Sequence, residues 1–289
     1  MTEKIREGIS FFFPAFNDAG TIGLLVEDGL RVLPLVTDDF EIIIINDGSF
    51  DDTGQVADGL AARHPQVRVI HHEVNMGYGA ALKSGFAAAT KELIFYTDGD
   101  RQFDVGELPK LLAEVEGTGI VSGYRVSRAE GSERRVSSAL YNIVSTKLFG
   151  LGIRDLDCAF KVIRREVLHD LLLQMDGDFI CAELFYHAHR RGFRVRQVPV
   201  HHYPRTYGVS MAYSATGIAR SLLEFGVLVW QLRGRDPYLH ARHALLRREF
   251  EVRRKVHQDR FDATPHKQPI KGATGTPPVL RETPDLADR

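Results

Sequence analysis

Three carboxylates follow one short apolar run. The stretch FYTDGDRQFD, residues 95–104, contains Asp98, Asp100 and Asp104, and only Arg101 offsets their charge. Mg²⁺ and Mn²⁺ prefer oxygen ligands, commonly one or two carboxylates completed by substrate phosphates. Asp98 and Asp100 are therefore candidate ligands of a metal that also contacts a diphosphate. The alternative is a turn whose aspartates cap the following helix.

Short apolar runs rich in Ile and Phe alternate with helical patterns in the first hundred residues. Continuous apolar runs are typical of strands buried on both faces of a parallel sheet. The alternation predicts an α/β protein with a mostly parallel sheet between layers of helices. The expected strands are 9–13, 41–45, 67–70 and 93–96, and the expected helices are 21–35, 53–63 and 78–89.

Ligands of such sheets bind outside the carboxyl ends of the strands, so the loops that follow the strands are the candidate site. These loops are rich in Asp, Asn and Gly and span residues 14–20, 46–53, 72–79 and 97–104. Asp47 follows a buried strand, where its carboxylate can accept hydrogen bonds from a ribose or a base. Asp52 or Thr53 is expected to cap the next helix. Gly99 lets a ligand approach the backbone because it has no Cβ.

The third loop, with the helix that carries Lys83 behind it, is similar to a phosphate-binding turn. It lacks the full Gly-x-Gly-x-x-Gly order, and no acidic residue ends the second strand in the context that a dinucleotide site requires. A nicotinamide cofactor is therefore disfavoured.

The rest of the chain divides into three parts. We expect one globular domain over residues 1–212, two helical segments over 213–260 and a disordered tail over 261–289, which is rich in Pro, Thr and Gly. Within the globular domain the expected helices are 106–116, 136–149 and 179–191, the strands are 119–122, 159–163 and 194–200, and the long loops are 124–135 and 201–211.

Composition excludes some classes of protein. A net charge of -1 and a pI near 6.9 argue against nucleic-acid binding through bulk positive charge. Phe11, Phe12 and Phe13 are stopped by Pro14, too soon for a signal peptide, and the apolar segment 222–232 is shorter than the roughly 20 residues of a spanning helix. We therefore expect a cytoplasmic protein.

The basic segment 239–257 leaves two interpretations open. Beside the apolar segment before it, it could lie on the anionic inner face of a membrane as a peripheral contact. Alternatively, it is a solvated charged helix used to form a homo-oligomer.

Five segments in order resemble one family. Together they are similar to the inverting glycosyltransferases of family 2 with the GT-A fold, and among these to polyprenyl-phosphate sugar transferases of the dolichyl-phosphate mannose synthase type. The resemblance covers roughly residues 9–211. The segments are PAFNDAGTI (14–22), INDGSFDDT (45–53), NMGYGAALKSGF (75–86), DGDRQ (98–102) and DLDCAFKVIRREVL (155–168).

The resemblance implies a donor site for a nucleotide sugar, with UDP or GDP as its nucleotide. Asp98, Asp100 and Gln102 would hold Mg²⁺ or Mn²⁺ against the diphosphate, and the metal would neutralise charge on the leaving group. Asp47 would contact the base or ribose. The other residues expected around the nucleotide are Pro14, Ala15, Phe16, Asn17, Lys83 and Gly99.

Two further segments resemble the acceptor half of the family. Glu183 in FICAEL would bind the sugar or act as a general base, whereas the alternative is a carboxylate near a helix N-terminus. Arg205 in RTYGVSM would contact phosphates. The resemblance therefore implies three catalytic residues, Asp100, Glu183 and Arg205. Met211 replaces the lysine that usually ends this loop, which removes one phosphate contact.

The most favoured function is transfer of a sugar from a nucleoside diphosphate sugar to a polyprenyl phosphate, with inversion. A phosphate acceptor is already anionic and needs no base, so Glu183 would position rather than deprotonate. With a hydroxyl acceptor, Glu183 would be a required base. The other hypotheses are a non-catalytic nucleotide-binding protein and a nucleotidyltransferase, although the latter's Gly-rich, lysine-containing N-terminal loop is absent.

Overall fold

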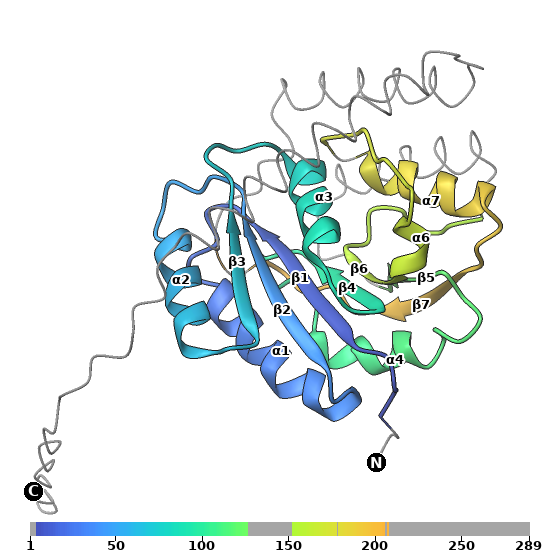
Figure 1. The fold of residues 1–289 in the computed structure, drawn as a ribbon, viewed down its shortest axis with the longest axis horizontal. Coiled ribbons are helices and arrows are strands. Elements are labelled where there is room, and N and C mark those ends of the chain that lie inside the picture. Colours follow the sequence, from blue (N-terminus) through green and yellow to red (C-terminus); the bar gives the residue numbers. More distant parts are fainter. Residues whose placement is uncertain (1–3, 127–151, 178, 206, 208–289) are drawn as a thin grey trace, which may run out of the picture. The chain divides into compact units, whose positions relative to one another are not determined.

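A seven-stranded, mostly parallel sheet forms the centre of the protein (Figure 1). The computed structural model describes residues 4–126, 152–177, 179–205 and 207. The strand order is β3-β2-β1-β4-β6-β5-β7. The strands are β1 (Ile9–Ala15), β2 (Phe40–Asn46), β3 (Val67–His71), β4 (Leu93–Thr97), β5 (Ile120–Arg125), β6 (Phe160–Arg164) and β7 (Val195–Val200).

Helices cover both faces of this sheet. Those between the first four strands run as right-handed crossovers predict, with α1 and α2 on one face and α3 on the other. The helices are α1 (Ile22–Val36), α2 (Thr53–Arg63), α3 (Tyr78–Ala88), α4 (Leu108–Leu112), α6 (Arg165–Leu168) and α7 (Ile180–Arg190), with a 3-10 turn, η1, at Val105–Glu107.

The first half of the fold agrees with the sequence prediction, and the fold class is confirmed. β1 to β4 are parallel neighbours in the expected way, but β6 runs antiparallel between β4 and β5. The helix expected at 106–116 is shorter, because η1 and α4 together span 105–112. The helix expected at 136–149 and the segments 213–260 and 261–289 lie outside the described residues, so the boundary at 212 stays a prediction.

The cap of α2 differs from the expectation. Asp52 occupies the N-cap position, but its side chain makes no capping hydrogen bond. Instead Asp51 Oδ1 accepts from the backbone N–H of Thr53 at 2.9 Å. Asp52 therefore has the predicted N-cap position, but the side-chain hydrogen bond comes from Asp51.

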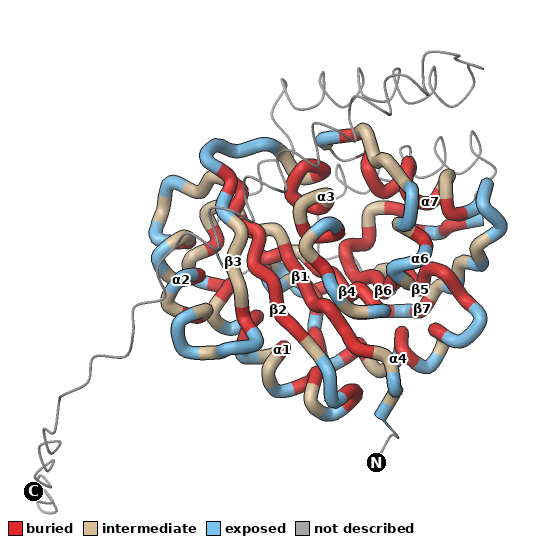
Figure 2. Tube along the Cα trace, in the orientation of Figure 1, coloured by how far each residue is buried: buried red, intermediate tan, exposed pale blue. Residues whose placement is uncertain are grey.

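The core alternates between the two faces of β1. Phe11 stacks on Phe95 at 4.8 Å between ring centroids, whereas Phe12 stacks on Tyr96 at 5.5 Å. Successive strand residues point to opposite faces, so these pairs belong to separate layers. The middle strands are buried along nearly their whole length (Figure 2). Both cysteines, Cys158 and Cys181, are buried free thiols.

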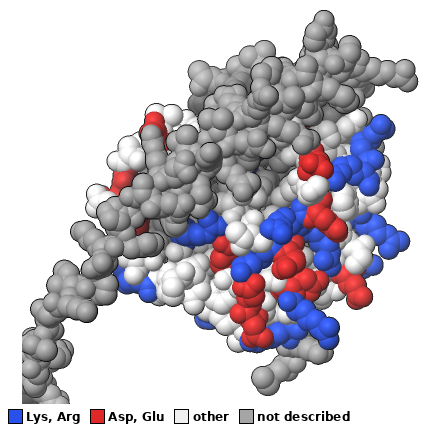
Figure 3. Space-filling model, in the orientation of Figure 1, with Lys and Arg blue, Asp and Glu red and all other residues white. Residues whose placement is uncertain are grey.

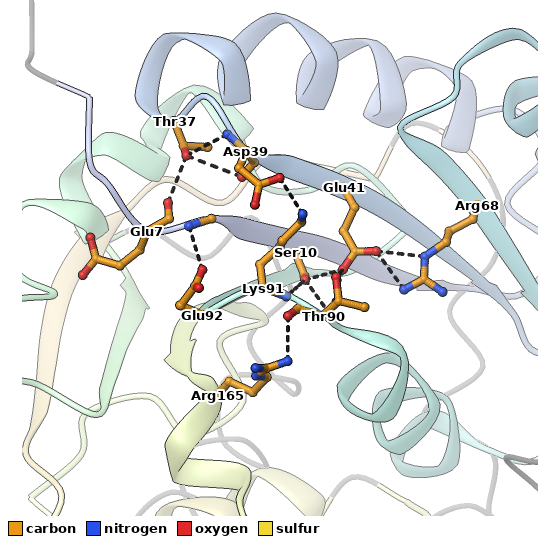
Figure 4. A network of polar contacts seen from close by, with 11 residues as sticks. Glu7, Ser10, Thr37, Asp39, Glu41, Arg68, Thr90, Lys91, Glu92 and Arg165 are labelled. Carbon is orange, nitrogen blue, oxygen red and sulfur yellow. Dashed lines mark hydrogen bonds and ion pairs between the residues drawn. The ribbon is translucent and has the colours of Figure 1, made fainter.

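A polar network closes the amino-terminal edge of the sheet, opposite the candidate site (Figure 4). Glu41 accepts from Ser10 Oγ at 2.6 Å, from the Thr90 amide at 2.8 Å and from Arg68 Nε at 2.8 Å. Burial alone would raise the pKa of Glu41, but these bonds hold it below its usual value. The network ties β1, β2 and β3 to the start of β4, which makes this edge structural.

Charges of both signs are mixed over the described surface in view, without a broad patch of one sign (Figure 3). Among the described residues, we find no helix with the length and apolar character needed to span a bilayer.

The close approach of α3 to β1 requires glycine at one position. A Cβ on Gly85 would lie 2.2 Å from the Phe12 ring, whereas a Cβ on Gly23 of α1 would meet nothing within 4 Å. We predict that Gly85→Ala lowers the free energy of unfolding by about 1–3 kcal/mol through overpacking. The control Gly23→Ala should be neutral or stabilising by up to about 1 kcal/mol. Urea denaturation measures both, and equal effects would contradict this account of the α3–β1 contact.

Candidate active site

The carboxyl ends of β1 and β4 meet so closely that only glycine fits between them. The Gly99 amide donates to Pro14 O at 3.1 Å, and a Cβ on Gly99 would lie 2.5 Å from that oxygen. Thr21 Oγ1 donates to Gly99 O at 2.8 Å from the other side. The predicted Pro14 and Gly99 are therefore in contact. The group that approaches Gly99 closely is the backbone of Pro14.

Two residues of these loops have left-handed backbones without being glycine. Asn17 has φ 58° and Arg101 has φ 60°. Such conformations cost free energy and concentrate at functional sites. Asn17 is held by partners on the next loop, since its amide donates to Ser49 Oγ and its Oδ1 accepts from the Phe50 amide, each at 3.0 Å. Phe16 lies edge-on to Phe50 at 5.8 Å between centroids.

Asp98 and Asp100 lie together at the end of β4, as the sequence predicted. Asp100 is buried, and its Oδ1 accepts from the Gln102 amide at 3.0 Å. Asp98 is half-buried as a residue, but its Oδ1 atom is buried without a hydrogen-bond partner among the described residues. An unpaired buried carboxylate oxygen is costly unless a ligand or cation satisfies it.

The surroundings of the pair disfavour two ionised carboxylates. Burial, followed by the negative charge of Asp100, raises the pKa of Asp98 to about 7, although the Tyr78 hydroxyl, Lys161 and Arg205 act against the shift. Burial also raises the pKa of Asp100, against the effect of Arg205. A divalent cation between the two carboxylates would remove this penalty.

Asp18 is a third carboxylate at this place, and the sequence pattern predicted no role for it. It is buried, its Oδ2 accepts from the Phe16 amide at 3.0 Å, and burial raises its pKa to about 6, with a contribution from Asp100. The signal available was its position beside Asn17 in the first loop. Its proximity to Asp100 is a property of the fold rather than of the spacing.

Arg205 brings positive charge to these carboxylates from the loop after β7. Its guanidinium donates to Asp100 Oδ2 at 2.6 Å and lies 3.9 Å from Asp18 Oδ1. Gln102 fixes the same loop to the Asp-x-Asp segment. Its side-chain amide donates to Tyr203 O at 2.8 Å, and its backbone carbonyl accepts from the Tyr203 amide at 2.8 Å. The predicted Arg205 and Gln102 therefore adjoin Asp100.

The residues present fit a divalent cation bound jointly with a phosphate ligand. Asp98 and Asp100 offer oxygen donors, and Gln102 lies beside them. Within the described ranges, no group of three or more His, Cys, Asp or Glu side chains is arranged as a complete metal cage. A cation held by two carboxylates therefore needs further oxygen ligands, such as diphosphate or water.

Lys161 is a second residue without an assigned role in the sequence analysis. Its ammonium is fully buried and donates to Leu156 O at 3.1 Å and to Cys158 O. The same nitrogen lies 5.4 Å from the centroid of the Tyr96 ring. It lies on β6, beside β4, and its charge lowers the pKa of Asp98. The antiparallel strand therefore places a fixed positive charge beneath the site.

Asp47, Lys83 and Glu183 are engaged with other parts of the chain. Asp47 Oδ1 accepts from His72 Nδ1 at 2.6 Å and from the Met76 amide at 2.9 Å, and its Oδ2 accepts from the Gly77 amide at 3.0 Å. Asp47 thus holds the loop before α3.

Lys83 and Glu183 both contact the segment 174–176. Lys83 pairs with the Asp176 carboxylate, and Asp176 O accepts from the Gly79 amide at 2.8 Å at the start of α3. Both oxygens of Glu183 accept from the Gln174 amide at 2.9 Å, and Oε2 also accepts from the Met175 amide at 3.0 Å. Lys83 of α3 and Glu183 of α7 therefore both bind the segment 174–176, which lies between them in the contact network.

The chain matches a family model over many of the residues that build this site, although Glu183 and Arg205 lie beyond the match. The model described as "Glycosyl transferase family 2" matches residues 10–172, which include the strands and loops up to β6. The chain belongs to glycosyl transferase family 2. Its sheet and flanking helices are those of the GT-A fold.

Two curated relatives and one solved structure illustrate the similarity. The chain is 32% identical over 235 residues to polyprenol monophosphomannose synthase of Mycolicibacterium smegmatis, covering 77% of this chain and 86% of that protein. It is 32% identical over 209 residues to a glycosyltransferase of Haloferax volcanii, covering 68% of this chain but 33% of that protein.

The solved structure is glucosyl-3-phosphoglycerate synthase from Mycobacterium tuberculosis in complex with Mn²⁺, uridine diphosphate and glucosyl-3-phosphoglycerate. It is 21% identical, with a TM-score of 0.54, and covers 78% of this chain and 77% of that chain. This likeness concerns the fold. The chain spans 33% of the length of the Haloferax volcanii relative and 62% to 63% of the length of two further curated relatives.

The raised pKa values give a pH dependence of stability. With Asp18 at about 6 and Asp98 at about 7, above the usual value for Asp, the folded protein binds more protons than the unfolded chain between about pH 4 and 7. Stability without a cation should therefore fall as pH rises through this window. Millimolar Mn²⁺ should raise the melting temperature more at about pH 7.5 than at about pH 5, since ionised carboxylates bind it best.

The matching variant is Asp98→Asn, measured with EDTA and with Mn²⁺ at about pH 7.5. It should melt about 2–4 °C higher than the unsubstituted protein in EDTA, because one repelling charge is gone, and lose most of the Mn²⁺ increment. Asp38→Asn, at an 86% exposed carboxylate, should do neither. An Mn²⁺ increment independent of pH and of Asp98 would refute this metal site.

Glu183 provides a separate prediction about the segment 174–176. In Glu183→Gln an amide NH₂ would face the backbone N–H donors of Gln174 and Met175. The loss should be about 1–3 kcal/mol of unfolding free energy, measured by denaturant titration. Glu166→Gln, at an exposed carboxylate of α6, is the control and should be neutral. Unchanged stability of Glu183→Gln would contradict the anchoring role.

Proposed function

We propose that this glycosyltransferase moves a sugar from a nucleoside diphosphate sugar to a polyprenyl phosphate with inversion, using Mg²⁺ or Mn²⁺. The observation that carries the proposal is the Asp98–Asp100 pair, with its partnerless buried oxygen and Arg205 at its rim. The similarity to a polyprenol monophosphomannose synthase supports the acceptor class. The Mn²⁺ and uridine diphosphate in a protein of the same fold support the donor class and the metal.

In this mechanism the acceptor's phosphate oxygen attacks C1 of the sugar from the face opposite the leaving group. The bond between C1 and the donor's diphosphate breaks, and the nucleoside diphosphate leaves with the electron pair. A bound divalent cation would neutralise the charge that develops on this leaving group. Asp98, Asp100 and Gln102 would hold that cation, while Arg205 would turn its guanidinium to a phosphate.

Pro14, Ala15, Phe16 and Asn17 would line the nucleotide pocket beside the loop that carries Asp47. The Gly99 backbone, which contacts Pro14, would lie beside them. Lys83 would reach the nucleotide only after leaving Asp176, so its role in binding is the least supported part of the proposed site.

The hydrogen bonds of Glu183 support the proposal of a phosphate acceptor over that of a hydroxyl acceptor. Burial raises its pKa to about 7, which suits a general base, but both its oxygens already accept backbone hydrogen bonds. A base must first reach the proton that it removes, so the geometry counts for more than the pKa. We therefore propose a positioning role for Glu183, and a phosphate acceptor requires no base.

A lipid-linked acceptor would bring the enzyme to the cytoplasmic face of a membrane as a peripheral protein. The basic segment 239–257 is the part of the sequence that suits an anionic surface. A homo-oligomer through that segment is the competing proposal.

The deciding assay compares a polyprenyl phosphate with the matching polyprenol as acceptor for labelled UDP- and GDP-sugars. We expect transfer to the phosphate from one nucleotide class, none to the alcohol, and loss of transfer with EDTA or in Asp100→Ala. Transfer to the alcohol would support the hydroxyl-acceptor alternative. Metal-dependent nucleotide binding without transfer to any acceptor would support a binding protein, and pyrophosphate release from a nucleoside triphosphate with a sugar phosphate would indicate a nucleotidyltransferase.

A further inference from the structure

A line of three polar side chains runs from the end of β2 into α3. Asp47 Oδ1 contacts His72 Nδ1 at 2.6 Å, and His72 Nε2 contacts Ser84 Oγ at 2.8 Å. Asp47 and His72 are buried, at 3% and 7% exposure. Both nitrogens of the His72 ring are thus engaged, and the ring has a single orientation that satisfies them.

The backbone fixes the ends of this line as firmly as the side chains do. The Asp47 amide donates to Ala15 O and the His72 amide donates to Asn46 O, each at 2.9 Å. These bonds extend the parallel pairing of β1, β2 and β3 by one residue beyond the strands. Because Asn46 pairs with His71 in the sheet, Asp47 and His72 follow in register and lie side by side.

A carboxylate only accepts hydrogen bonds, so the His72 ring carries its proton on Nδ1 toward Asp47. In the neutral ring, Nε2 then accepts from the Ser84 hydroxyl. In that form of the ring, the order of donors runs from Ser84 of α3 through His72 to Asp47. Loss of either outer partner would free the ring to rotate.

The line continues from Asp47 into an exposed loop. Asp47 accepts from the Met76 and Gly77 amides at 2.9 and 3.0 Å, while Val74 and Met76 are 67% and 38% exposed. The loop therefore buries little apolar surface, and the Asp47 carboxylate is a main anchor. Gly48 allows the contact of the two loops, since a Cβ there would lie 2.3 Å from the Val74 backbone.

We propose that His72 and Ser84 are positioning residues for the donor nucleoside: they fix Asp47 and, through it, the loop 73–77, and so set nucleotide affinity without taking part in the transfer. This inference rests on the proposed function, because it takes the Asp47 loop as one wall of the nucleotide pocket. The expected ligand is the nucleoside part of UDP or GDP.

The same three residue types occur in hydrolases, but the setting here differs. Ser84 lies inside α3, not at a sharp strand-to-helix turn with free backbone N–H groups beside it. The nucleophile elbow and oxyanion hole of such enzymes are therefore not formed at Ser84. A hydrolytic role would be revealed by labelling of Ser84 with a fluorophosphonate probe, and such labelling would overturn the positioning role.

The test uses the full chain and three substitutions in the line of Asp47, His72 and Ser84. His72→Leu removes both polar contacts, His72→Asn keeps a donor near the place of Nδ1, and Ser84→Ala removes the outer partner. The control is His71→Leu, because His71 is the neighbouring histidine and contacts Asn46 and Asp58 rather than Asp47. The probes are UDP and GDP, each titrated with Mn²⁺ in a calorimeter.

We expect His72→Leu to weaken binding of the preferred nucleotide by about tenfold or more, and Ser84→Ala by about threefold, as lost hydrogen bonds of ordinary strength would. His72→Asn should partly restore affinity, and His71→Leu should change it by less than about threefold. With donor at saturation, kcat should be nearly unchanged in all four. Unchanged affinity in His72→Leu, or a fall in kcat with affinity retained, would overturn the proposal.

A second measurement needs no ligand. The Met76 and Gly77 amides donate hydrogen bonds to Asp47. Their hydrogen exchange should accelerate in His72→Leu but not in His71→Leu. Equal exchange in both would overturn the anchoring of the loop even if affinity fell. If the unsubstituted protein bound neither nucleotide, the proposed function and the affinity part of this inference would fail, whereas exchange would still decide the anchoring.

Discussion

The site depends on one electrostatic constraint, the placing of Asp98 and Asp100 side by side in a buried position at the end of β4. Burial raises the pKa of both carboxylates, and the negative charge of Asp100 raises the pKa of Asp98 further. The surrounding structure supplies partial compensation. Arg205 contacts Asp100 from one side, and the buried Lys161 lowers the pKa of Asp98 from β6. Neither satisfies the buried Oδ1 of Asp98, and this remaining deficit is what a bound cation would remove.

The rest of the fold holds this arrangement from two directions. The contact of Gly99 with Pro14 O brings the first and fourth strands together, while the antiparallel β6 adds Lys161 beneath them. The loop after β7 closes the edge through Gln102, Tyr203 and Arg205. Residues distant in sequence therefore form one charged centre, and the GT-A fold of family 2 glycosyltransferases accounts for how they meet.

The sequence was sufficient for the parts of the structure that depend on local pattern. The apolar runs predicted β1 to β4, because buried parallel strands need no alternation, and the helical patterns at 53–63 and 78–89 predicted α2 and α3. Asp98 and Asp100 were also predictable, since their position follows directly from the end of a strand. The reversal of β6 was not, because strand direction depends on connections that leave no local pattern.

Contacts between distant segments were the other limit of prediction. Arg205 and Asp100 are 105 residues apart, and Asp18 reaches the pair only through the approach of β1 to β4. His72 was closer to being predictable, because the β2–β3 register places it beside Asp47. Glu183 was predicted to be a site residue from resemblance, but its hydrogen bonds to the backbone of 174–175 follow from tertiary packing.

The most direct test of the central claim is Mn²⁺ binding itself, measured by electron paramagnetic resonance in the presence and absence of UDP or GDP. The account predicts that one nucleotide converts free Mn²⁺ to a bound signal at one site per chain, and that Asp98→Asn and Asp100→Asn each abolish the conversion. Bound Mn²⁺ that is independent of nucleotide and survives both substitutions would contradict the assigned role of the two aspartates. So would the absence of bound Mn²⁺ with either nucleotide.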